Sequence, residues 1–143
     1  MATDIEYALM AGASYRDTRA DINKFPTPAG WNLVSRHPED QSSGFEAVTF
    51  GNGPTLATST ELVISYAGTY DKDITGDWAT NVGLATGGGS KQLEQAAEYY
   101  LQVKAANPNA TITLTGHSLG GGLAALVGVF FGDSAVTSNS SLA

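Results

Sequence analysis

A serine lies between closely spaced glycines in the run TGHSLGGG at residues 115–122. An apolar segment with strand character precedes this run, and a segment rich in alanine and leucine follows it. Where a strand turns sharply into a helix, the two backbones come so close that a Cβ would collide, and glycine is needed on both sides of the central residue. The run therefore predicts a nucleophile elbow at Gly116, His117, Ser118 and Gly120, with the Ser118 Oγ exposed to a substrate.

Predicted strands and helices alternate along the second half of the chain. In order they are a strand at 61–66, a helix at 90–106, a strand at 112–114, a helix at 119–131 and a strand at 135–137. The helix at 119–131 is apolar on every side, which predicts burial all round, and Gly132 closes it. This order is typical of βαβ units, so we expect a single α/β domain over residues 1–143 with a parallel-rich central sheet flanked by helices.

The spacing of apolar residues also predicts which face of each helix is buried. Thr3 and Glu6 form a capping-box pattern that opens a first helix. Its expected apolar face is Ile5, Ala8 and Leu9. For the helix at 90–106, which Ser90 caps and Asn107 ends, the expected face is Leu93, Ala96, Ala97, Tyr100 and Leu101. Between these helices we expect an edge strand at 31–35, a turn at 37–40 and a strand at 45–50 that pairs with 61–66.

Composition excludes several classes of function. Seven Lys and Arg residues against fourteen Asp and Glu residues give a formal charge of −7, which argues against a nucleic-acid partner. The chain has no cysteine, so it has no disulfide, no thiolate metal site and no cysteine nucleophile. No run approaches the ~20 apolar residues of a membrane span. The first residues lack a signal-peptide pattern, so the location of the protein is unknown, and secretion stays compatible with the sequence.

Ser118 needs partners before it can attack an ester. A histidine must accept its proton, a carboxylate must orient that histidine, and N–H groups such as that of Leu119 must stabilise the oxyanion. Of the two histidines, His117 lies inside the turn, where we expect its side chain to point to the opposite side from the Ser118 hydroxyl. His37 precedes the serine, against the order serine, acid, histidine of α/β-hydrolases. Asp133 is expected about 20 Å away, at the end of a helix. We therefore expect the triad acid and histidine to lie outside these residues.

Together these motifs resemble the class 3 (fungal-type) lipase family of α/β-hydrolases. The likeness covers residues 60–132 and includes LVISYAGT at 62–69, DWATNV at 77–82 and GHSLGG at 116–121. The last run is also similar to bacterial secreted lipases. The resemblance implies a partial α/β-hydrolase fold that lacks its C-terminal strands and helices, an acyl-enzyme mechanism without a cofactor, and a second oxyanion donor from the Thr69 N–H. Ala67 stands where the family usually has arginine, which bears on packing.

Residues 70–77 take the place of a lid in that family. The segment is short and charged, so we expect at most a small flap and an open site that favours esterase-like or phospholipid-like substrates. Activity on short soluble esters without interfacial activation would support this expectation, and strong interfacial activation would contradict it. Asp71, Asp73, Thr75 and Gly76 also match half of a calcium loop. Val82 stands where such a loop requires glutamate, so we predict no metal site there.

Three interpretations of the chain follow. In the first, which we favour, it is the N-terminal portion of a lipase or esterase for triacylglycerol or phospholipid, inactive or weakly active without the rest. In the second, it is a noncatalytic binding or structural module with the same fold. In the third, which can accompany the first, two copies associate through an open sheet edge. Hydrolysis of p-nitrophenyl esters by the wild type and by Ser118→Ala separates the first two.

Overall fold

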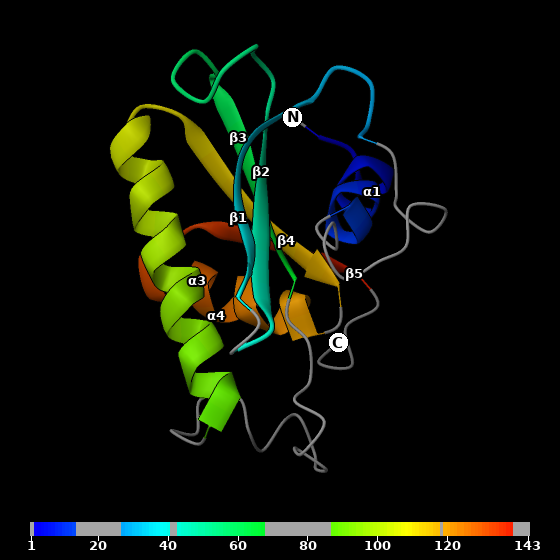
Figure 1. Ribbon diagram of the computed structural model, residues 1–143. Helices are drawn as coiled ribbons and strands as arrows, with labels where there is room; N and C mark the ends of the chain where they lie inside the picture. The colour runs from blue at the N-terminus through cyan, green and yellow to red at the C-terminus, as the bar shows by residue number, and fades with distance from the viewer. Residues whose placement is uncertain (1, 14–26, 41–42, 68–86, 118, 139–143) are drawn as a thin grey trace.

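The computed structural model describes residues 2–13, 27–40, 43–67, 87–117 and 119–138. Its strands are β1 (Asn32–Asp40), β2 (Phe45–Gly51), β3 (Glu61–Ala67), β4 (Thr111–His117) and β5 (Ser134–Ser138). Its helices are α1 (Asp4–Ala13), α3 (Gly87–Ala106) and α4 (Leu119–Phe131). The strands form one sheet in the order β1-β2-β3-β4-β5 (Figure 1).

The sheet is mixed. β1 pairs with β2 and β2 with β3 in antiparallel fashion, whereas β3 with β4 and β4 with β5 are parallel pairs. The parallel pairs are those joined through α3 and α4, as βαβ connections require. The predicted α/β class and the predicted hairpin of β2 and β3 are therefore confirmed, and the parallel part of the sheet is confined to its last three strands.

The helices cover both faces of the sheet. α3 and α4 lie on one side and α1 lies on the other (Figure 1). Side chains of β2, β3 and β4 pack with α3 and α4 in the larger buried cluster, which includes Phe45, Ile64 and Leu114. A smaller cluster on the side of α1 includes Met10 and Phe50. The sheet therefore has two cores, and parallel strands are buried on both faces as expected.

The capping box at the start of α1 is confirmed. The Thr3 N–H donates to Glu6 Oε1 at 2.9 Å, and the Glu6 N–H donates to Thr3 Oγ1 at 3.2 Å. These hydrogen bonds satisfy two main-chain amide groups at the start of the helix. The bond from the Thr3 N–H to the carboxylate also lowers the pKa of Glu6.

The predicted apolar face of α1 is wrong. Ile5 is 75% exposed, whereas Tyr7 and Met10 are buried. The Met10 carbonyl accepts a hydrogen bond from Ser65 Oγ on β3 at 2.9 Å, which fixes this side of the helix against the sheet. α1 has apolar residues around most of its circumference, so two different sets of apolar residues have helical spacing. Which set is buried depends on the tertiary contacts of the helix.

The predicted turn at 37–40 is also wrong, because β1 continues through it to Asp40. Pro38 cannot donate a hydrogen bond to a neighbouring strand. An edge strand tolerates such a residue, and the pairing of β1 with β2 shifts register between His37 and Asp40. The expected edge strand is therefore present and longer than predicted.

Helix α3 differs from its prediction at the start and on one face. It begins at Gly87, so Ser90 is not its cap, and it ends before Asn107 as expected. Ala96 and Tyr100 are buried as predicted, but Leu101 is 52% exposed. Tyr99 and Val103 are buried on this helix as well. Because α3 contacts both β2 and α4, the buried part of its surface is wider than the spacing of its apolar residues predicts.

Helix α4 has the predicted bounds, and Gly132 follows it with a φ of 76°, a conformation that favours glycine. The prediction that α4 is buried on every side is wrong for its last turn, where the side chains of Val129 and Phe130 are 85% and 80% exposed. The first two turns are buried between the sheet and α3. Of the helices in the described ranges, none is long and apolar enough to cross a membrane.

Three tyrosines on the α3 side of the sheet have raised pKa values. Burial raises the pKa of Tyr66 and Tyr99 above 10.0. Burial and the neighbouring Asp133 carboxylate raise the pKa of Tyr100 to about 12. The Tyr100 hydroxyl donates a hydrogen bond to Asp133 Oδ2, and this bond links α3 to the two-residue connection between α4 and β5.

These pKa values predict a loss of stability at high pH. Between pH 10.0 and about 12 the unfolded chain releases a proton that Tyr100 retains in the native state, so the free energy of unfolding falls as pH rises. Tyr100→Phe removes this titration, and its free energy of unfolding will fall less steeply over that range. Urea denaturation at a series of pH values measures both slopes. Equal slopes in the two proteins would contradict the assignment.

Candidate active site

The carboxyl ends of β3 and β4 lie side by side, with Tyr66 paired to Gly116. β4 ends at His117 and α4 begins at Leu119, so one residue of the chain, Ser118, connects the strand to the helix. Ser118 itself lies outside the described residues. The strand and helix that the sequence predicts on either side of it are in place, and in open α/β sheets ligands bind at this edge.

The glycines around Ser118 allow direct backbone contact. A Cβ built on Gly116 would lie within 3.0 Å of the main chain of Gly120, closer than real Cβ atoms come. A Cβ on Gly120 would meet the carbonyl of Tyr66 in the same way, and the Cα of Ala67 would be 3.3 Å from it. No side chain fits at either position. The close approach expected from the sequence therefore exists, and it joins the first turn of α4 to the ends of both β3 and β4.

The start of α4 has the chemistry of an anion site. The first N–H groups of a helix have no partner within it, and the aligned peptide dipoles make this end partly positive. Leu119 is the first residue of α4 and its side chain is buried. Its amide is therefore suited to stabilise negative charge beside residue 118. Thr69, the other predicted oxyanion donor, lies outside the described residues.

One histidine lies level with this turn but far across the sheet. Strand pairing places the following residues in one row: His37, Ala47, Tyr66, Gly116 and Thr137. Three strand spacings separate the first of these from Gly116, which is about 14 Å. A general base must lie within hydrogen-bond reach of the proton it accepts. The structure therefore does not bring His37 to the turn, in agreement with the expectation that it is not the base.

His37 is instead packed among aromatic side chains. Its ring lies edge-on to those of Phe45 and Tyr99, at centroid distances of 5.0 and 6.2 Å. Its Nδ1 is 2.8 Å from the carbonyl oxygen of Pro38. These contacts give His37 a structural role at the β1 edge of the larger core.

His117 ends β4 and is half-buried. Side chains alternate between the two faces of a strand, and Thr115 lies on the side of α1. The same alternation puts His117 on that side. Its predicted orientation away from the Ser118 hydroxyl stays a prediction, because Ser118 lies outside the described residues.

Asp133 lies at the opposite end of the parallel strands. It directly precedes β5, whose first residue, Ser134, pairs with Thr113 near the start of β4. The 13 residues of α4 separate Asp133 from the turn, a length of about 20 Å. The structure therefore places Asp133 at a helix end, as expected, with its carboxylate bonded to Tyr100 and away from residue 118.

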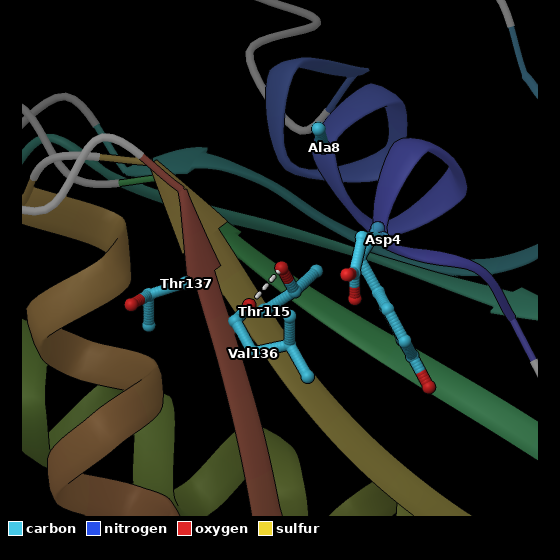
Figure 2. A pocket seen from close by; sticks show the side chains of 6 residues that line it. Asp4, Ala8, Thr115, Val136 and Thr137 are labelled. Atoms are coloured by element: carbon cyan, nitrogen blue, oxygen red, sulfur yellow. Dashed lines mark hydrogen bonds between the residues drawn. The ribbon is translucent and has the colours of Figure 1, made fainter.

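Two cavities lie outside this turn. One of about 390 Å³ is lined by Asp4, Tyr7, Ala8, Thr115, Val136 and Thr137 (Figure 2). The Thr115 hydroxyl there donates to the Val136 carbonyl. The other, of about 350 Å³, lies between α3 and α4 and is mostly apolar, with Leu126 and Phe130 in its wall. Neither includes a residue of the turn, and sequence analysis had no signal for either.

The described residues offer no metal centre. Among them, no three or more His, Asp or Glu side chains are grouped closely enough to hold an ion. The half-matched calcium loop at 71–82 and the predicted lid at 70–77 lie outside the described ranges.

Residues 6–142 match the Tle-like phospholipase domain family. The chain belongs to this family. It is also similar to an extracellular phospholipase A1 from Serratia liquefaciens, with 39% identity over 110 residues, which are 77% of this chain and 31% of that protein. The predicted relationship to lipases is thereby confirmed.

Solved lipases share the fold at low sequence identity. Lipase II from Rhizopus niveus matches with a TM-score of 0.59 and 21% identity, over 90% of this chain and 54% of that one. A lipase from Rhizopus microsporus var. chinensis matches with a TM-score of 0.62 and 17% identity, over 96% and 56%. The chain thus spans about half the length of these lipases and about a third of the Serratia protein. The predicted partial α/β-hydrolase fold is confirmed.

The backbone contact at Gly120 predicts that adding one methyl group there strongly destabilises the fold. Gly120→Ala places a Cβ against the Tyr66 carbonyl, so we expect it to lower the free energy of unfolding by about 3 kcal/mol. Gly132→Ala is the matched control, because its Cβ meets no atom within 4 Å and only the positive φ opposes it, at about 1 kcal/mol. Urea denaturation measures both. An effect of Gly120→Ala no larger than that of Gly132→Ala would contradict the contact.

Proposed function

We propose that this domain is the nucleophile-bearing part of a serine carboxylic-ester hydrolase that acts on lipid esters. The observation that supports the proposal most strongly is the turn from β4 into α4, where only Ser118 separates strand from helix and glycines replace every side chain that would block their contact. A serine in such a turn projects its hydroxyl above the sheet edge. Membership in a phospholipase domain family agrees with this chemistry.

In the proposed mechanism, the Ser118 Oγ attacks the ester carbonyl carbon while a histidine accepts the hydroxyl proton. The negative charge on the carbonyl oxygen is stabilised by the N–H groups of Leu119 and Thr69. Collapse of the tetrahedral intermediate breaks the bond to the alcohol, which takes the proton from the histidine. Water then attacks the acyl-enzyme by the same steps and releases the fatty acid. No cofactor takes part.

We propose that the histidine and the acid come from outside these 143 residues. His37 is three strands away from the turn, and Asp133 lies at the far end of α4. The match with this chain covers only 54% and 56% of two solved lipases with this fold. On its own the chain is therefore expected to be inactive or weakly active.

Phospholipid is the substrate we favour. The family is described as phospholipase-like, and the Serratia liquefaciens relative is an extracellular phospholipase A1. Triacylglycerol is the alternative, in view of the fold shared with fungal lipases. The same relative supports a location outside the cell.

A second proposal is that the isolated chain associates with itself. Within the described residues β5 has no strand on its outer side, and Val129 and Phe130 of the neighbouring helix are exposed. An open parallel edge beside apolar surface favours association. Light scattering coupled to size-exclusion chromatography is expected to show a dimer or larger species, and a clean monomer at micromolar concentration would contradict it.

The test of the hydrolase proposal is Ser118→Ala in the full-length protein. Loss of the nucleophile is expected to lower kcat for p-nitrophenyl butyrate and for phospholipid on the order of a thousandfold or more. His37→Ala is the control, and it should retain kcat within about threefold, because His37 lies on the edge strand β1, three strands away from the turn. A Ser118→Ala protein with the wild-type rate would overturn the proposal.

A further inference from the structure

Tyr66 makes a hydrogen bond that packing does not require. Its side chain is fully buried near the end of β3, and its hydroxyl donates to the main-chain carbonyl of Ala96 in α3 at 2.8 Å. Its ring lies 6.0 Å from that of Phe45. Phenylalanine would fill the same space without a polar atom to satisfy. The hydroxyl is therefore not needed to fill the core. Its contribution is a directional hydrogen bond between β3 and α3.

The main chain of Tyr66 touches the turn that follows β4. Tyr66 pairs with Gly116 on β4, and its carbonyl lies where a Cβ on Gly120 would be. The side chain of Tyr66 is thus hydrogen-bonded to α3, while the main chain of the same residue contacts the first turn of α4. A shift of the end of β3 relative to α3 would move the backbone on which Gly120 rests, and with it the adjoining residue Leu119.

We infer that Tyr66 is a positioning residue for oxyanion stabilisation. Its bond to Ala96 fixes the end of β3, and the end of β3 fixes the first turn of α4 and with it the Leu119 amide. Amide donors stabilise an oxyanion only when they are held at the correct distance before the reaction. This inference rests on the proposed hydrolase function, in which the Leu119 amide binds the oxyanion.

Tyr99 supplies a matched control. It lies on α3, the helix that carries Ala96, and is also buried. Its hydroxyl bonds to Thr49 Oγ1 on β2 at 2.7 Å and also to the Ser35 side chain on β1. Tyr99→Phe therefore removes the same atom from the same interface between helix and sheet. Its partner strand β2 lies one strand further from α4 and does not pair with β4.

The experiment compares Tyr66→Phe, Tyr99→Phe and Ser118→Ala in the full-length protein. Each variant loses buried hydrogen bonding and should melt a few degrees lower, and Tyr99→Phe should lose at least as much as Tyr66→Phe, because its hydroxyl has two partners. Only Tyr66→Phe should lower kcat for p-nitrophenyl butyrate, by about tenfold, with KM changed less than about twofold. The inhibition constant of an alkyl boronic acid, which mimics the tetrahedral intermediate, should rise by the same factor as kcat falls.

Two results would overturn the inference. One is an unchanged kcat in Tyr66→Phe, and the other is an equal fall in kcat for both phenylalanine variants, which would reflect a general loss of stability. Ser118→Ala separates this failure from that of the proposed function. If Tyr66→Phe fails in either way while Ser118→Ala is inactive, the hydrolase proposal stands and only the role of Tyr66 is refuted. If Ser118→Ala is active, the hydrolase proposal is refuted, and the inference about Tyr66 is refuted with it.

Discussion

The first turn of α4 lies against the ends of β3 and β4 with no side chain between them. Gly116 contacts the main chain of Gly120, and Gly120 contacts the carbonyl of Tyr66. This contact brings the N-terminus of α4 to the carboxyl edge of the sheet. There the first amide groups of the helix favour negative charge. The chemistry proposed for Ser118 depends on this meeting of backbones.

The rest of the fold keeps that contact in place. On the side of α3, tyrosine hydroxyls link helix to sheet and helix to loop, through Tyr66, Tyr99 and Tyr100. On the other side, α1 is held to β3 by the hydrogen bond between Met10 and Ser65. Polar bonds buried on both faces give the layers one fixed arrangement, because each leaves an unsatisfied group if the layers slide.

Local signals in the sequence predicted the local parts of this structure. The bounds of α4 followed from glycines at its two ends, where Gly120 permits the close contact and Gly132 takes a positive φ. Features that depend on distant residues were missed. The buried side of α1 is set by the strands it meets, and Pro38 is accommodated in a strand only because that strand lies at the edge. No pattern in β3 distinguishes Tyr66 from an ordinary core residue.

Covalent labelling of the full-length protein with a fluorophosphonate tests the central claim most directly, because such probes react with serines that a base and an oxyanion hole activate. Peptide mapping by mass spectrometry then locates the adduct. If Ser118 is the nucleophile, a single adduct forms on Ser118, in step with the loss of esterase activity. Loss of activity with the adduct on another residue, or full activity after Ser118 is labelled, would contradict it.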